Sequence, residues 1–393
     1  YRNGKFPEAI ETLEKARTMQ GGKDPYHQFF LAMAYWQTDQ RDKALANYKG
    51  AALWMQDGDR GDEQRRFQAE AEEVLGLSPQ DRTDLLVKWH SERIEAEPNN
   101  PEPWLDRLRL YAKEQAWDKA ANDYVQVIDL SQDIEVSESI RTAARVELAA
   151  LPELFRRVVE LRPDASIPWI GRGQYRALRS QWEEALSDYA RANPTRAITD
   201  ETFAYAGLSL LTDDRQGYEQ LCSDLVTRDE DLKDGYAAYV AARTCSIGPA
   251  TAVQPEQLVE WASRAVQQNQ DAWLLNALGL AYYRAGHLQQ AIEALEKSNA
   301  GRWKRLFKAQ NGLVLAMAHH SAGRQEEAQQ WLQQATVTID EARPKDASKP
   351  APAYADDWIA LELLRREAEG LIRPNDTADS EEPQGDQEEL NKN

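Results

Sequence analysis

The feature that most constrains this chain is an internal repeat. Residues 103–124 (PWLDRLRLYAKEQAWDKAANDY) align without a gap with residues 168–189 (PWIGRGQYRALRSQWEEALSDY). Five Pro, Trp, Ala and Tyr positions coincide, among them Trp104 with Trp169. Because a sequence period decides the architecture before any local propensity does, the chain is predicted to be an array of similar units.

The two ends of the chain also resemble each other. Residues 1–15 (YRNGKFPEAIETLEK) match residues 283–297 (YRAGHLQQAIEALEK), and residues 29–44 match residues 313–328. A module of two helix pairs and a closing helix is therefore predicted to occur twice.

Each unit has the pattern of two amphipathic helices. In residues 101–130 the apolar positions are Trp104, Leu105, Leu108 and Tyr111, followed by Trp117, Ala120, Ala121, Tyr124 and Ile128. Spacings of three and four residues place these groups on one face of a helix. Glycine follows several predicted helices, at Gly4, Gly286 and Gly323, where a positive φ ends a helix without a Cβ clash.

This pattern resembles the tetratricopeptide repeat, which has a large residue at position 4, a small one at 8, an aromatic at 11, Ala at 20, a large residue at 24 and a small one at 27. The unit that begins at Ser166 supplies Trp169, Gly173, Ala185, Tyr189 and Ala192. Units from Pro25, Pro101, Ala272 and Ala309 also fit, whereas 199–228 and 232–269 fit only roughly. The resemblance implies an all-α fold, a right-handed α-α superhelix of antiparallel helix pairs.

Composition and turn residues suggest three parts. Residues 1–76 are predicted to form a truncated module with a closing helix over 64–76. Residues 81–373 are predicted to form the main array, which ends in a closing helix over 354–372. Residues 374–393 carry seven acidic residues and a single Leu, so they cannot bury enough apolar surface to order. This last part is predicted to be a disordered acidic tail.

No catalytic, cofactor or metal residues are predicted. Cys222 and Cys245 lie in helical apolar patterns typical of buried small side chains. His319 and His320 are neighbours, which point about 100° apart on a helix and cannot chelate one ion as an i, i+4 pair can. The GxSxG, HExxH and Walker patterns are absent, as is a kinase core. The chain is therefore predicted not to be an enzyme.

The charge argues against two classes of partner. With 47 basic and 66 acidic residues the net charge is −19, which disfavours binding to nucleic acid or to anionic lipid. No run of 18 apolar residues is present, so no membrane span is predicted. Two cysteines in 393 residues fit a reducing, cytoplasmic setting. Other proteins are the predicted partners, and no oligomeric state is predicted.

The resemblance also implies where partners bind. In the family, positions 2, 5, 9, 12 and 13 of the first helices line a groove that holds peptides or helices. The matching residues are Glu102, Arg109, Lys113, Gln174, Asn276 and Arg284. Trp36 and Trp303 are not explained by repeat packing and are predicted as exposed contacts. A carboxylate clamp is not expected, because positions 5 and 9 are Leu105/Arg109, Ile170/Gln174 and Asn276/Leu280.

The predicted function is an interaction scaffold. The segments YEQLCSDLV (218–226) and YAAYVAARTC (236–245) are similar to C-terminal arrays of large bacterial signalling proteins, in which a Ser/Thr kinase or WD-repeat module lies upstream. The chain begins at Tyr1 and not at Met, so we expect a fragment. Two alternatives stay open: an accessory region of an enzyme whose catalytic domain precedes Tyr1, and a structural spacer.

Overall fold

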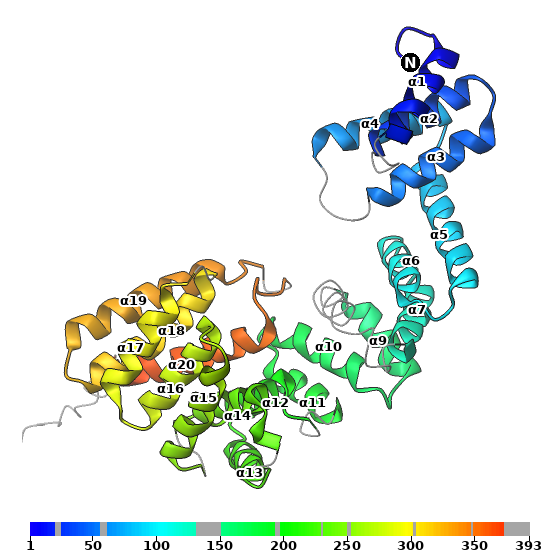
Figure 1. Ribbon diagram of the computed structural model, residues 1–393. Coiled ribbons are helices and arrows are strands. Elements are labelled where there is room, and N and C mark those ends of the chain that lie inside the picture. Colours follow the sequence, from blue (N-terminus) through cyan, green and yellow to red (C-terminus); the bar gives the residue numbers. More distant parts are fainter. Residues whose placement is uncertain are drawn as a thin grey trace, which may run out of the picture. The chain divides into compact units, whose positions relative to one another are not determined.

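The computed structural model describes residues 1–19, 25–55, 61–130, 151–192, 197–228, 231–249, 253–301, 304–346 and 349–372. Within these ranges the chain forms α-helices, one short 3-10 helix (η2, Asp231–Lys233) and no β-strand. The predicted all-α architecture of helix pairs is confirmed. The chain divides into two compact units, Tyr1–Ala144 and Arg145–Asn393 (Figure 1). The division into 1–76 and 81–373 stays a prediction, and the predicted tail lies outside the described residues.

The first unit contains two helix pairs and three further helices. Its helices are α1 (Phe6–Met19), α2 (Pro25–Gln37), α3 (Arg41–Trp54), α4 (Asp62–Leu75), α5 (Pro79–Ala96), α6 (Pro101–Lys113) and α7 (Trp117–Leu130). Helix α2 pairs with α3 and also packs against α1 and α4, while α6 pairs with α7 and packs against α5. Phe29, Tyr48, Leu75 and Leu110 belong to one core that joins α2, α3, α4, α5 and α6.

In its described residues the second unit begins with the single helix α9, stacks five helix pairs and ends with a last helix. Its helices are α9 (Pro152–Leu161), α10 (Ser166–Ala177), α11 (Trp182–Ala192), α12 (Asp200–Leu211), α13 (Arg215–Val226), α14 (Gly235–Ser246), α15 (Pro255–Gln268), α16 (Ala272–Arg284), α17 (Leu288–Asn299), α18 (Arg305–Ser321), α19 (Gln325–Ala342) and α20 (Ala355–Ile372). The segments 199–228 and 232–269, which match the repeat only roughly, form the pairs α12/α13 and α14/α15 and continue the array.

Glycine at position 8 is explained by contact within a pair. A Cβ atom on Gly173 would lie 2.7 Å from Cδ2 of Tyr189, and one on Gly279 would lie 2.5 Å from Cγ of Leu295. Carbon atoms normally approach no closer than about 3.5 Å. The small residue therefore lets the two helices of a pair approach each other, as the repeat pattern predicts. The turns also behave as expected, since Gly286 and Gly323 have φ values of 75° and 76°.

A buried ion pair recurs in the two aligned units. Arg172 on α10 donates two hydrogen bonds to Asp188 on α11, at 2.9 and 2.6 Å. Arg107 on α6 binds Asp123 on α7 in the same way, at 2.9 and 2.7 Å. Such forked contacts fix both the distance and the orientation of two side chains. The pair thus holds the first helix of each unit to the second.

Candidate functional site

Three of the predicted partner-binding residues lie on α6 in the first unit. The side chains of Glu102, Arg109 and Lys113 are exposed. Arg109 is paired with Asp106 on the same helix, at 2.9 Å. Because α6 is held from behind by α7 and α5, these residues present a mixed-charge surface on a fixed helix.

The two predicted tryptophans differ in what the structure shows. Trp36 is half-buried, packs against the first-unit core and lies under the guanidinium of Arg41, which is 3.7 Å from the ring centroid. It is therefore partly engaged in packing. Trp303 lies outside the described residues, and its role stays a prediction.

A second candidate site is in the second unit, where α20 lies against the first helices of the pairs. Helix α20 packs against α10, α12 and α18, and also against α19 (Figure 1). Side-chain ion pairs, described below, add α14 and α16. We call the surfaces of α10, α12, α14, α16 and α18 that face α20 the α20-binding face. Nine α20 residues are buried: Ala355, Trp358, Ile359, Ala360, Leu361, Glu362, Leu364, Ala368 and Ile372.

The closest approach of α20 is to α12. A Cβ atom on Gly207 would lie 2.4 Å from Cγ2 of Ile359 and 3.4 Å from Cδ1 of Leu363. Gly173 and Gly279 occupy the same repeat position, but there the space of a Cβ atom is taken by a side chain from the second helix of the same pair. Gly207 is instead small because α20 occupies that space.

The α20-binding face carries a buried arginine opposite the start of α20. Arg243 on α14 has a side chain that is only 6% exposed, and it contacts Asp356 at 2.8 Å and Asp357 at 3.3 Å. Its guanidinium also lies 3.8 Å from the ring centroid of Phe203. Burial, and the nearby Asp356 carboxylate, raise the pKa of Asp357 above its usual range. Acidic groups in the first turn of α20 also meet the positive end of its helix dipole.

A second buried arginine binds α20 near its other end. Arg284 on α16 is 8% exposed and binds both carboxylate oxygens of Glu367, at 2.5 and 2.7 Å. It also donates to the backbone oxygens of Ser246 and Ile247. Arg284, predicted from the sequence to meet a partner, is therefore bound by a helix of its own chain.

The other two predicted residues of this unit lie differently. Asn276 is 4% exposed, and its Nδ2 donates to Oδ1 of Asn311 at 2.6 Å. Asn311 in turn donates to Ser298 and Asn299. Asn276 thus belongs to a buried amide network. Gln174 on α10 is half-buried.

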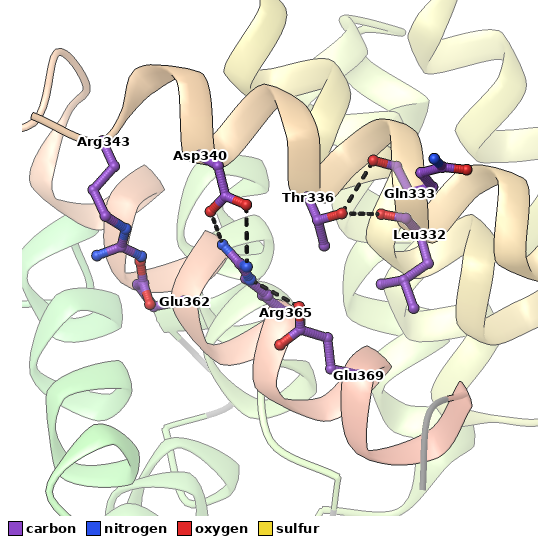
Figure 2. A network of polar contacts seen from close by, with 8 residues as sticks. All are labelled: Leu332, Gln333, Thr336, Asp340, Arg343, Glu362, Arg365 and Glu369. Carbon is purple, nitrogen blue, oxygen red and sulfur yellow. Dashed lines mark hydrogen bonds and ion pairs between the residues drawn. The ribbon is translucent and has the colours of Figure 1, made fainter. Parts of the chain in front are cut away.

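Helix α20 is also tied to α19. Figure 2 shows Arg365 between Asp340 on α19 and Glu369 on its own helix, with Nη1 of Arg365 2.5 Å from Asp340. In the same view Arg343, which follows α19, is paired with Glu362. One partner of each pair is exposed, Arg343 at 41% and Asp340 at 57%, and ion pairs open to solvent typically contribute below about 1 kcal/mol to stability. They therefore fix the orientation of α20 more than they add to the free energy that holds it in place.

The described ranges hold no group of three or more His, Cys, Asp or Glu side chains that could bind a metal ion. Cys222 and Cys245 are both buried and unbridged, as the apolar pattern predicts. Within the part of the chain that the structure describes, no helix has the length and apolar character needed to cross a bilayer.

Comparison with known proteins supports the repeat assignment. Family models described as tetratricopeptide repeat match residues 1–62 and 312–334. The repeats are thus confirmed in these two segments. No curated protein matches the sequence.

Two solved structures are similar at low scores. YrrB, described as a TPR protein with an unusual peptide-binding site, has 13% identity and a TM-score of 0.25, and the match covers 64% of this chain and 93% of that one. Yeast Tom70 has 11% identity and a TM-score of 0.31, with 94% and 93% covered. At these scores neither comparison bears on function, so the functional argument rests on the contacts of α20.

Sequence reasoning missed several residues of this site, among them Gly207, Arg243, Asp356, Asp357 and Glu367. The closing helix itself was predicted, over 354–372, but nothing in its sequence pattern says which surface it covers. Arg243 could have been suspected, because it is a charge in the otherwise apolar segment YAAYVAARTC, and such a charge needs a buried partner.

Proposed function

We propose that this chain is a protein-interaction scaffold that binds helical or extended segments of other polypeptides. The observation that carries the proposal is the way in which α20 is bound by the rest of the second unit. One helix is held by apolar contacts and two buried arginines against the first helices of the five pairs, from α10 to α18. A surface that binds a helix from its own chain has the shape and chemistry that binding a helix in a groove requires.

The exposed face of α6 is the second part of the proposal. Glu102, Arg109 and Lys113 lie on it, at positions that meet ligands in the tetratricopeptide-repeat family. Trp36 and Trp303 are proposed as further contacts. The finer context, the C-terminal arm of a large bacterial signalling protein in the cytoplasm, is supported only by the sequence likeness of residues 218–226 and 236–245.

Site-specific photo-cross-linking tests the α6 surface. A photoreactive amino acid replaces Arg109 in one variant and Gln126, which is exposed on α7, in a matched control. We expect position 109, but not position 126, to form adducts reproducibly with the same protein. These adducts should be lost when the chain also carries Lys113→Glu. Equal adducts from both positions, or none from position 109, would contradict binding at this face.

The coding sequence immediately before Tyr1 tests the context. A kinase or WD-repeat module there is expected from the proposal. If a catalytic domain adjoins Tyr1 and loses activity when residues 1–393 are removed, the chain is better described as an accessory region of that enzyme.

A further inference from the structure

Helix α20 is placed as a ligand and not as the next repeat. In a helical array each unit contacts its immediate neighbours. Helix α20 follows the pair α18/α19, yet it also packs against α12 and α10, which lie at the far end of the second unit. The segment before α20 takes part as well, because the backbone N–H of Ala351 donates to the carbonyl of Leu178 at 2.9 Å.

The charges of the α20-binding face match those of α20. Arg243 and Arg284 are its buried cations, in a chain whose net charge is −19. The α20 residues opposite them are Asp356 and Glu367. These two acids are eleven positions apart, which is three helical turns, so they lie on one face of the helix.

Apolar residues lie between the two acidic positions and continue beyond Glu367. Leu361, Leu364, Ala368 and Ile372 follow spacings of three and four, and all are buried. Residues 358–362 are buried in succession, so the start of α20 is enclosed on every side, and from Leu364 on the buried positions have the spacing of anchors on a helix in an apolar groove. The face therefore selects an amphipathic helix with a carboxylate at its first turn and another three turns later.

The arginines also explain why the face would not remain empty. When α20 leaves, Arg284 loses Glu367, and Arg243 loses Asp356 and Asp357 and keeps the more distant Asp200 of α12, 4.0 Å away. A buried charge without its partner is strongly unfavourable. Exchange for another acidic helix keeps both pairs, whereas a neutral helix does not.

We propose that α20 is an internal ligand, and that the same face binds, in its place, an amphipathic helix of another protein that carries these two acidic positions. The inference rests on the proposed scaffold function and adds the class of partner and the element that competes with it. Because α20 is tethered, it acts as a competitor at an effective concentration of about a millimolar. An outside helix binds well only when the hold of α20 is weakened.

The test uses the full chain and a fluorescent peptide with the sequence of residues 354–372. Leu364→Ala weakens α20 at a buried position, and Leu371→Ala makes the same change where the side chain is 41% exposed. Neither changes the α20-binding face. In fluorescence anisotropy the Leu364→Ala chain is expected to bind the peptide at least tenfold more tightly than the wild-type and Leu371→Ala chains.

Two controls make the result specific. A peptide with Asp356→Asn and Glu367→Gln is expected to bind the Leu364→Ala chain at least tenfold more weakly than the native peptide. A chain with Glu367→Gln is a second, near-isosteric way to loosen α20, and it is expected to bind the native peptide more tightly than wild type does. Circular dichroism confirms that each variant is folded.

Three outcomes would overturn the inference. The first is equal peptide binding by wild type and by the Leu364→Ala and Glu367→Gln chains. The second is equal binding of the native peptide and the peptide with Asp356→Asn and Glu367→Gln. The third is a dimer of either variant chain in light scattering, because a second copy would then be the occupant. Cross-linking at position 109 is independent of α20. Its failure together with successful peptide exchange would therefore reject the scaffold role of α6 and leave the α20 result standing.

Discussion

The contact between Gly207 and Ile359 gives the most direct test of where α20 lies. A Cβ on Gly207 would be 2.4 Å from Cγ2 of Ile359, about 1.1 Å inside the closest ordinary carbon–carbon contact of about 3.5 Å. Overpacking of this kind costs about 1–3 kcal/mol. Gly207→Ala also raises the helix propensity of α12 by about 1 kcal/mol, but that gain is present whether α20 is docked or not. The docking equilibrium should therefore weaken by the full overpacking cost.

Native-state hydrogen exchange of the α20 amides measures this equilibrium, because exchange reports local opening. At about 1.4 kcal/mol per tenfold, Gly207→Ala is expected to speed exchange in α20 by about 5- to 150-fold. Gly312→Ala is the matched control, since its added Cβ would meet Ala335 at 3.4 Å and Trp331 at 3.6 Å. It should leave α20 exchange unchanged.

A double-mutant cycle completes the test. Ile359→Ala removes the methyl group that clashes, at a cost of about 2–5 kcal/mol for the lost packing. Added to that background, Gly207→Ala should no longer speed exchange, which gives a coupling energy of about 1–3 kcal/mol. Equal effects of Gly207→Ala in both backgrounds would refute the placement of α20 against α12.

Three further predictions concern the rest of the chain. Burial lowers the pKa of His90 from 6.5 to about 4. The first unit should therefore hold its full stability above pH 6.5 and lose up to about 3 kcal/mol as the pH falls toward 4, because only the unfolded chain takes up the proton. Hydrogen exchange in α5 at pH 7 and pH 5, compared between wild type and His90→Leu, measures this loss. Asp188→Asn should destabilise the second unit by about 3–5 kcal/mol, because Arg172 and Arg176 both face that carboxylate. Calorimetry measures the effect, and Glu160→Gln, at an exposed pair on α9, should leave the thermal midpoint unchanged. Cys222 and Cys245 are fully buried, so a thiol reagent should label neither in the folded chain and both in denaturant, and rapid labelling of the native protein would disprove the burial.

The helix pairs could be predicted from the sequence because their contacts are local. Gly173 meets Tyr189 and Gly279 meets Leu295, in each case sixteen residues later, so the pattern within one unit already encodes the contact. The pair of Arg172 and Asp188 has the same spacing and recurs in the aligned unit. It was overlooked because charged residues on a helix are usually assigned to solvent.

The position of α20 could not be predicted in this way. Asp356 meets Arg243 across 113 residues of sequence, and no periodicity links residues that far apart. The same limit applies to Gly207, whose small size fits the repeat pattern for a reason that the repeat does not contain. Arg284 was selected as a groove position, but the sequence could not say that Glu367 already binds it.

The long sequence distance between Arg243 and Asp356 also has a consequence for protein synthesis. At about 5–20 residues per second, the ribosome needs about 6–23 s to add the 113 residues between them. For part of that interval α14 is already outside the ribosome while α20, which carries Asp356 and Asp357, has not yet been made. The nascent chain therefore presents Arg243 without Asp356 and Asp357. An acidic helix bound there at that stage would meet no competition from α20.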